Sequence, residues 1–374
     1  MPDKETIINR LIKNSAEILT EDEFRKKLNG SEPLTHYIGF EISGYVHLGT
    51  GLMTALVIKD LQSLGVKCIV WLADWHTFIN EKLDGTFETA QKIGKGYFTE
   101  ALRASIKAVG GDDSKVDFRL ASESYYATNS TAYHYWETVM RVAQHTSTSR
   151  MLRSIDILGK KLGTEVDHSK TIYPAMQAAD IFFLEVDIAH AGMDQRKAHV
   201  IMRDTATQVY GGKPKPVALH HPLLIGLQKP PVWPIPKGTD ERDVIAQMKM
   251  SKSKTDSAIW VHDAPEEIMR KINKAFCPEQ EIQYNPILNW VGHILFWDRK
   301  TPFVVEREEK HGGNVEFTTY EDLEKAFAAG EVHPMDLKSA AAKEIIELLT
   351  PVREHFALPE NAAKKAELDS LLQK

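Results

Sequence analysis

The sequence predicts an α/β fold: a Rossmann-like, doubly wound parallel sheet with inserted helices, followed by a mainly α-helical C-terminal domain. Three observations predict it. A strand, a helix and a buried strand follow one another early in the chain, strand and helix alternate again after a long helical stretch, and parallel-strand signals end near Val261. A chain of 374 residues exceeds one ordinary core, so we expect two domains.

The first unit begins with a strand over residues 37–41, and a helix follows over about 48–64. The next strand covers residues 67–73, where every residue after Lys67 is apolar, as in a strand that is covered on both faces. Before this unit, residues 5–29 have the apolar spacing of a single helix that ends at Asn29-Gly30.

The rest of the chain is predicted from the same kinds of pattern. Residues 213–247 hold seven prolines, so much of that stretch is predicted to be loop. The other expected elements are helices over about 90–109, 131–161, after Pro174 and 195–210, and strands over about 115–121 and 186–191. The predicted domains are a helical extension (1–30), a Rossmann-like sheet domain (31–260) with a helical connective insertion at about 131–170 and a loop at 249–254, and a helical domain (261–374).

Composition narrows the function classes. The net charge of −6 argues against a protein coated in positive charge, and the longest apolar runs are far shorter than a membrane helix of roughly 20 residues. The N-terminus lacks the layout of a signal peptide, so we expect a cytoplasmic protein with no membrane partner. Cys68 and Cys277 are isolated, and adjacent His220 and His221 should point to opposite faces of an extended segment, so no metal site is predicted.

A glycine-rich turn, Gly44-Tyr45-Val46-His47-Leu48-Gly49-Thr50, follows the first predicted strand. Open α/β sheets bind ligands at this position, where a phosphate can lie at the start of a helix. His47 can donate a hydrogen bond to a phosphate oxygen, and Gly49 allows close approach. The run Gly49-Thr50-Gly51, with Asp74 further on, also comes near a dinucleotide fingerprint, so an oxidoreductase stays open here.

A second motif, Lys249-Met250-Ser251-Lys252-Ser253, stands about two hundred residues later, after the proline-rich stretch. Lys249, Lys252 and Lys254 bring three ammonium groups together with two hydroxyls. Such a loop can supply positive charge where pyrophosphate leaves in the transition state. The charges alone are equally typical of a solvated basic loop.

Together the two motifs resemble the HIGH and KMSKS signatures of class I aminoacyl-tRNA synthetases. The fourth position of the first motif is Thr50 and not histidine, which replaces an ionisable side chain by a neutral hydroxyl. The resemblance implies ATP with Mg²⁺ as a substrate and His47, Lys249 and Lys252 as catalytic residues. The implied ATP-binding residues are His47, Gly49, Thr50, Lys249, Met250, Ser251, Lys252 and Ser253.

Two polar faces bear on which amino acid is activated. Tyr37, Gly39 and Glu41 share one face of the first predicted strand, because side chains alternate there. On the helix near Pro174, the spacings of four and three residues place Tyr173, Gln177 and Asp180 on one face. Amphipathic packing alone would explain either face.

The segments Tyr173 to Asp180 and Gly192-Met193-Asp194-Gln195-Arg196-Lys197 resemble archaeal and eukaryotic tyrosyl-tRNA synthetases, and the likeness runs through nearly the whole chain. It implies tyrosine–tRNA ligase activity on L-tyrosine, ATP and tRNA(Tyr), in a homodimer. Tyr37 and Asp180 would bind the substrate phenol. The ammonium group would be held by Tyr173, Gln177 and Gln195, and Gly39 and Glu41 would line the tyrosine site. His311, His333 and Asp336 would bind the anticodon.

Three alternatives remain on sequence grounds. A tryptophanyl enzyme shares the fold and both signatures but should lack the pair Tyr37 and Asp180. A dinucleotide-dependent oxidoreductase would rest on Gly49-Thr50-Gly51. A non-catalytic RNA-binding descendant of a synthetase is disfavoured by the intact motif at 249–253.

Overall fold

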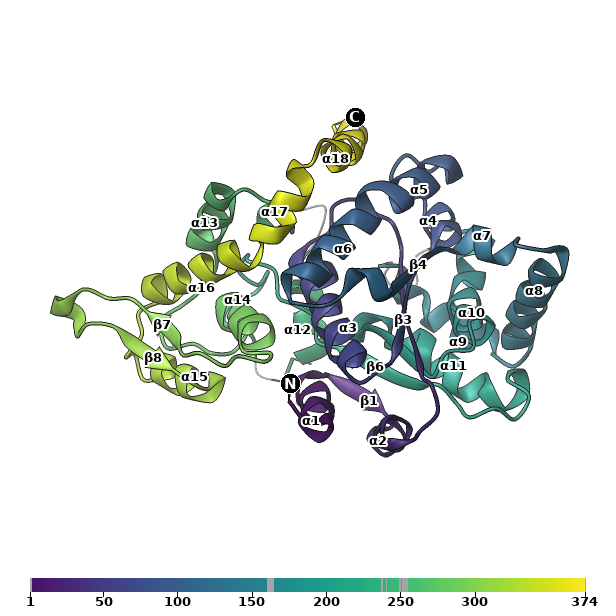
Figure 1. Cartoon of the computed structure of the whole chain (residues 1–374), viewed down its shortest axis with the longest axis horizontal. Helices are drawn as coiled ribbons and strands as arrows, with labels where there is room; N and C mark the ends of the chain where they lie inside the picture. Colours follow the sequence, from purple (N-terminus) through teal and green to yellow (C-terminus); the bar gives the residue numbers. More distant parts are fainter. Residues whose placement is uncertain are drawn as a thin grey trace.

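The computed structural model describes residues 2–159, 165–236, 238–239, 241–248, 250 and 255–373. In Figure 1 a central sheet is wrapped by helices, and a largely helical region drawn in green to yellow extends to one side of it. The last helix, at the yellow end of the chain, returns towards the blue helices of the sheet region.

The central sheet is doubly wound and mainly parallel, as predicted. Within the described residues it has the strand order β1-β6-β5-β2-β3-β4, and only β1 runs antiparallel to its neighbour. The strands are β1 (Glu17–Leu19), β2 (Thr35–Phe40), β3 (Lys67–Leu72), β4 (Val116–Leu120), β5 (Ile188–Gly192) and β6 (Val217–His221).

Strand β2 lies where the winding reverses. The chain passes from β2 to β3 and β4 on one side, then returns so that β5 pairs with the other edge of β2, with Tyr37 opposite Ala189. Right-handed crossovers in opposite directions lie on opposite faces of a sheet. A crevice therefore opens outside the carboxyl ends of β2 and β5.

Alternate residues of the strands face two separate cores. Ile38 and Val70 belong to one apolar cluster, whereas Tyr37 and Trp71 belong to the other. The first cluster is covered by α1 (Lys4–Asn14), α2 (Glu21–Asn29), η1 (Gly49–Met53), α3 (Thr54–Ser63), η2 (Gly94–Phe98) and α6 (Thr99–Ala108). The second is covered by α7 (Ala121–Tyr125), α8 (Asn129–Gln144), α9 (Thr148–Arg153), α10 (His168–Phe183) and α11 (Arg196–Val209).

Shorter pieces complete this region. They are α4 (Asp74–Ile79), α5 (Phe87–Ile93), η3 (Asp113–Lys115), η4 (Ile155–Leu158), η5 (Met193–Gln195), α12 (Glu241–Met248) and η6 (Thr255–Ser257). The helices α8, α9 and η4 occupy the stretch that was predicted to be helical over about 131–161.

The prediction of one helix over residues 5–29 is wrong. The chain forms α1 and α2 with β1 between them, and β1 pairs with β6 at the edge of the sheet. Thr20 begins α2 with a reciprocal capping box to Glu23. The pattern Thr-x-x-Glu is a helix-start signal that the apolar spacing concealed.

Two further boundaries differ from expectation. Strand β6 lies inside the stretch that was predicted to be mostly loop. Its five residues lie between Pro216 and Pro222 and are all buried, so they can form a strand despite the flanking prolines. Helix α10 begins at His168, so Pro174 lies inside it and not at its start. Proline lacks the N–H that would bond the carbonyl of Lys170, a local loss that tertiary packing tolerates here.

The C-terminal region is mainly helical, as predicted. Several helices begin with proline, whose missing N–H has no helical partner at that position. The elements are α13 (Pro265–Lys274), α14 (Pro286–Trp290), η7 (Val291–Leu295), η8 (Glu309–His311), α15 (Tyr320–Ala328), α16 (Pro334–Leu348), α17 (Thr350–Ala357) and α18 (Pro359–Leu372). An antiparallel pair, β7 (Phe303–Val305) with β8 (Val315–Phe317), was not expected. No helix among the described residues is both long and apolar enough to cross a bilayer.

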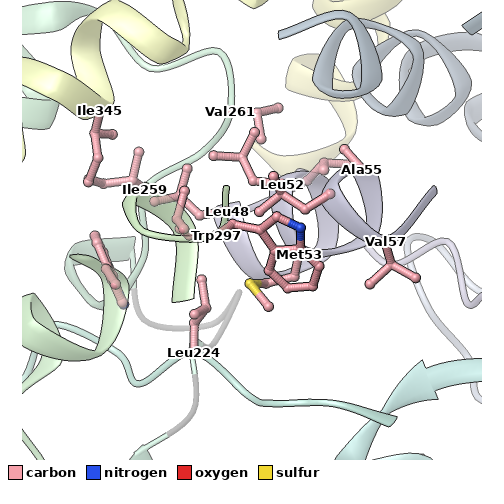
Figure 2. Close-up of a cluster of buried hydrophobic side chains, with 14 of the residues drawn as sticks. Leu48, Leu52, Met53, Ala55, Val57, Leu224, Ile259, Val261, Trp297 and Ile345 are labelled. Carbon is pink, nitrogen blue, oxygen red and sulfur yellow. The ribbon is translucent and has the colours of Figure 1, made fainter. Parts of the chain in front are cut away.

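A continuous apolar core joins the C-terminal region to the sheet domain. Figure 2 shows Leu52 and Met53 from η1 packed among side chains of both regions, including Ile259, Trp297 and Ile345. Leu52, Met53, Ile259 and Ile345 have no solvent exposure. The turn that carries His47 leads directly into η1. The buried side chains of η1 pack against the C-terminal region.

A buried ion pair lies at the same junction. Arg10 of α1 donates to both carboxylate oxygens of Asp60 in α3 (Nε to Oδ2 2.8 Å, Nη2 to Oδ1 2.5 Å). Trp297, which follows η7, donates its indole N–H to Asp60 Oδ2 at 2.9 Å. One fully buried carboxylate thus connects three segments that are distant in sequence.

Replacing Asp60 by alanine should lower the free energy of unfolding by about 3 kcal/mol, because it leaves the Arg10 charge partly buried without its partner. Lys13→Ala is the matched control, since its pair with Glu321 is exposed and its loss should cost less than about 0.5 kcal/mol. Urea unfolding of both variants measures the two costs. Equal, small costs would show that the Asp60 cluster does not stabilise the junction.

Candidate active site

A cavity of about 1010 Å³ lies at the carboxyl ends of β2 and β5, where the winding reverses. It brings together the described site residues that were predicted for tyrosine and ATP. These lining residues are Tyr37, Gly39, Glu41, His47, Gly49, Thr50, Tyr173, Gln177, Asp180, Gln195 and Met250. Lys249, Ser251, Lys252 and Ser253 lie outside the described residues.

Asp180 of α10 forms a buried acidic end of the cavity. Its side chain is 1% exposed, and the phenol of Tyr125 donates a hydrogen bond to Oδ1. Oδ2 has no hydrogen-bond partner among the described residues. Burial raises the pKa of Asp180 to about 8, against the lowering effect of hydrogen bonds from its tyrosine neighbours. The site therefore holds a carboxyl group that has one oxygen free for a ligand.

Tyr37 and Gly39 shape the wall next to this carboxyl group. A Cβ atom at position 39 would lie 2.3 Å from the Tyr37 hydroxyl oxygen, so the Tyr37 ring can lie over residue 39 only because that residue is glycine. Burial, together with nearby Asp180, raises the pKa of Tyr37 well above its ordinary value. Tyr37 therefore remains a neutral phenol that can both donate and accept a hydrogen bond.

Oxygen acceptors line the middle of the cavity. Gln177 Nε2 donates to Gln195 Oε1 at 3.3 Å, and Gln195 Nε2 donates to the carbonyl of Ile157 at 3.1 Å. This arrangement leaves Gln177 Oε1 without a partner among the described residues. Glu41 Oε2 accepts from Asn80 at 2.6 Å. A carboxylate and a free amide oxygen in one wall suit a bound cation such as an ammonium group.

The turn on the other side of the cavity holds the imidazole of His47 against Thr50. Nδ1 accepts a hydrogen bond from the Thr50 N–H at 3.2 Å, and Nε2 lies 3.3 Å from the Thr50 hydroxyl. Since Nδ1 accepts, the ring hydrogen of the neutral imidazole is on Nε2. A Cβ atom at Gly49 would lie 3.1 Å from the His47 ring, so glycine leaves room for this orientation. Thr50 thus orients His47.

Two residues at the acidic end were not assigned to it from the sequence. Tyr125 follows β4, and its ring stacks on that of Tyr135 with centroids 3.5 Å apart. His76 follows β3, and its Nε2 lies 3.9 Å from Asp180 Oδ2, while burial lowers its pKa to about 3. Both residues follow strands, and ligands bind at strand ends in such sheets, so their positions could have indicated a site. This signal does not predict which residue they contact.

The adjacent histidines of β6 do point to opposite sides. His221 lines the cavity and its Nδ1 lies 2.7 Å from His190 Nε2, whereas His220 Nε2 lies 3.0 Å from His199 Nδ1. Burial lowers the pKa of His220 and of His221 to about 4. Both are therefore neutral members of buried hydrogen-bonded pairs.

The predicted anticodon residues lie apart from the cavity, in the C-terminal region. His333 precedes α16, and its Nδ1 accepts a hydrogen bond from the Met335 N–H at 3.2 Å. Asp336 is in the first turn of the same helix, a favourable position for a negative charge. His311 ends η8, and its side chain lies outside the described residues.

The fold and this site agree with a comparison against known families. Residues 29–350 match the family described as tRNA synthetases class I (W and Y), and the chain belongs to that family. Its relatives at about 50% identity include tyrosine–tRNA ligases of archaea. The chain is 52% identical over 351 residues to a tyrosine–tRNA ligase of Thermococcus kodakarensis, covering 92% of each chain. The expected resemblance to tyrosyl-tRNA synthetases is confirmed.

Solved structures give the same assignment. The chain is similar to tyrosyl-tRNA synthetase from Pyrococcus horikoshii complexed with L-tyrosine, with a TM-score of 0.91, 48% identity and coverage of 98% of this chain and 100% of that one. The enzyme from Aeropyrum pernix gives a TM-score of 0.81 at 36% identity, with coverage of 99% and 100%. A tryptophanyl-tRNA synthetase from Aeropyrum pernix, 18% identical with a TM-score of 0.61, shares the fold.

The raised pKa of Asp180 predicts a pH-dependent stability. The folded protein holds this proton more tightly than the unfolded chain, where the carboxyl titrates near its usual 3.8. The contribution of this bound proton to the free energy of unfolding is therefore fully present below about pH 4 and is lost as the pH rises towards 8. Relative to Asp180→Asn, the wild type should lose about 1 kcal/mol of unfolding free energy per pH unit between pH 5 and 7. Urea unfolding of both proteins at pH 5, 6 and 7 measures this, and a constant difference would contradict it.

Proposed function

We propose that this chain is a tyrosine–tRNA ligase that activates L-tyrosine with ATP and transfers it to the 3′ end of tRNA(Tyr). The observation that carries the choice of amino acid is the buried Asp180 carboxyl group, whose free oxygen lies in a cavity also lined by Tyr37. A phenolic hydroxyl is the group that such a site can satisfy with hydrogen bonds in both directions.

The tyrosine half of the site is assigned as follows. Tyr37 and Asp180 bind the phenol, with Gly39 leaving space for the Tyr37 ring. Tyr173, Gln177 and Gln195 hold the ammonium group, and Glu41 adds negative charge to that wall. Phenylalanine would leave the buried carboxyl group without its partner, and tyrosyl enzymes are the familiar example of such hydroxyl discrimination.

The ATP half of the site is the turn at His47, Gly49 and Thr50 together with residues 249–253. His47 Nε2–H, oriented by Thr50, is the donor for phosphate oxygens. Lys249 and Lys252 would supply charge for the leaving pyrophosphate, with Met250, Ser251 and Ser253 in the same loop. Met250 lines the cavity and is 6% exposed, which supports placing this segment beside the nucleotide. Mg²⁺ would enter with ATP as part of the substrate.

Two displacements make up the reaction. An oxygen of the tyrosine carboxylate attacks the α-phosphorus of ATP, forming tyrosyl-adenylate as the bond to pyrophosphate breaks. A terminal ribose hydroxyl of tRNA then attacks the carbonyl carbon, loses its proton and releases AMP. Neither step requires a protein nucleophile. The protein contributes positioning and charge stabilisation by residues already oriented before the substrates bind.

The domain assignment is also a proposal. Residues 31–260 would form the catalytic domain with its connective insertion at about 131–170, and residues 261–374 would bind the anticodon. His311, His333 and Asp336 are the residues assigned to the anticodon, where histidine can stack on a base and the acid can accept hydrogen bonds. Residues 1–30 would be an extension of the catalytic domain, because β1 adds an edge strand to its sheet. We assign the enzyme to the cytoplasm, as the compartment where its tRNA is charged.

The ATP–pyrophosphate exchange reaction, run with each amino acid in turn, tests the proposed function. Exchange is expected with tyrosine and not with phenylalanine or tryptophan. Exchange with tryptophan alone would instead identify a tryptophanyl enzyme. The absence of exchange with every amino acid would leave a non-catalytic RNA-binding descendant of a synthetase.

A homodimer is supported by an apolar surface on the inserted helices. Tyr133 and Met140, seven residues apart on α8, are 73% and 66% exposed, and Tyr126 just before α8 is 50% exposed. The spacing places Tyr133 and Met140 on one face of the helix, opposite the buried side chains of Tyr135 and Val139. A second copy of the chain could cover this face by a two-fold contact.

Substituting aspartate for both Tyr133 and Met140 should convert the dimer to monomer, because it buries two unpaired charges at the contact. Sedimentation velocity measures the mass in solution. Val232→Asp, at an exposed apolar residue in the proline-rich stretch, is the control and should leave the dimer intact. A wild type that sediments as a monomer, or a dimer unaffected by the double substitution, would rule out this surface.

A further inference from the structure

The last helix of the chain reaches back to the active site. Leu372, at the end of α18, and Gln373 line the same cavity as His47, although more than three hundred residues separate them from it. In Figure 1, α17 and α18 pass beside α5 and α6 of the sheet domain. Nothing in the two signature motifs accounts for a C-terminal helix at this position.

The contact centres on Tyr45, which lies two residues before His47 in the glycine-rich turn. Its phenol donates a hydrogen bond to Asp369 Oδ1 of α18. Lys365, one turn earlier on α18, binds Asp369 Oδ2 at 2.8 Å, and its ammonium lies 5.7 Å from the centroid of the Tyr45 ring. The helix therefore holds Tyr45 through a hydrogen bond and through a cation above its ring.

The same turn is held from two other directions. The Val46 N–H donates to the phenol of Tyr97 in η2 at 3.2 Å, and that phenol is also 2.9 Å from His262 Nδ1. The Val261 N–H donates to the carbonyl of Val46 at 3.0 Å. Together with the hydrogen bond from Tyr45 to Asp369, these contacts hold the turn that presents His47.

Helix α18 is itself anchored on the sheet domain. Glu100 of α6 accepts hydrogen bonds from Lys364 of α18 at 2.7 Å and from His355 of the preceding helix α17 at 2.9 Å. Glu367 pairs with Lys92 of α5, and Leu368 is fully buried. Partial burial would raise the pKa of Asp369, but hydrogen bonds from Lys365 and Tyr45 outweigh this effect and lower it, so Asp369 is charged. The helix is thus a fixed part of the catalytic domain's surface.

We propose that α18 is a positioning element for the ATP half of the site: Asp369 holds Tyr45 and so fixes the turn of His47, while Leu372 and Gln373 close that side of the cavity. This inference rests on the proposed role of the turn in binding ATP. Tyr45 and Asp369 act through His47 and its turn and are positioning residues. The tyrosine end, built from α10 and the strand ends, has no contact with Asp369 among the described residues, so its affinity should be independent of α18.

The test uses the full-length chain with Tyr45→Phe and, separately, Asp369→Ala, in steady-state ATP–pyrophosphate exchange with tyrosine. Each variant should raise KM for ATP about tenfold, the effect of losing one hydrogen bond to a charged group, and change KM for tyrosine less than about twofold. Asp369→Asn keeps an acceptor for Tyr45 and should recover part of the loss. Ser370→Ala, at the next residue on α18, serves as the control, because the Ser370 hydroxyl donates to the Glu367 carbonyl of the same helix.

Each outcome decides the matter. A selective rise in KM for ATP, with melting temperatures close to the wild type, supports the positioning role. Unchanged constants, or equal rises for ATP and tyrosine, overturn it while leaving the proposed function intact. If the wild type itself shows no exchange with tyrosine, both the proposed function and the inference fail.

Discussion

The active site depends on one topological constraint, which is that β2 has β3 on one side and β5 on the other. Crossovers that wind in opposite directions lie on opposite faces of the sheet, so a crevice opens outside the carboxyl ends of β2 and β5. The cavity is the space that remains. The turn after β2 supplies His47, and the segment after β5 supplies Gln195, so residues distant in the chain meet without a long loop.

Within that space, burial determines the chemistry of each group. Asp180 is surrounded by aromatic rings and binds its proton more tightly than an exposed carboxyl group does. The same burial lowers the pKa of His76, so its imidazole stays neutral beside Asp180. A neutral histidine forms no ion pair with Asp180. The free oxygen of that carboxyl group is therefore kept for a hydrogen-bonding substrate.

The C-terminal region contributes more to this site than an appended binding domain would. Its helices share an apolar core with η1 and α3, and Trp297 bonds the same carboxylate as Arg10 of the first helix. α18 then reaches the cavity itself through Asp369 and Tyr45. The C-terminal helices and the turn that carries His47 are therefore in direct contact.

Local patterns in the sequence determined the main elements and the two faces of polar residues. The period of two in a strand placed Tyr37 and Gly39 on one face, and the helical period did the same for Gln177 and Asp180. Two short strands of the central sheet were not predicted from the sequence. Strand β1 follows a helix and has an apolar pattern that resembles its continuation, and β6 lies between prolines, which are typical of loops.

Only the tertiary structure decided which of these faces meet and what surrounds them. The approach of Tyr125 and His76 to Asp180 joins elements whose spacing in sequence carries no distance information. The contact of Asp369 with Tyr45 spans 324 positions and depends on how a whole domain docks. Sequence periodicity specifies the direction of a side chain on its own element. The partner across a cavity is set by packing of the complete chain, which no local pattern contains.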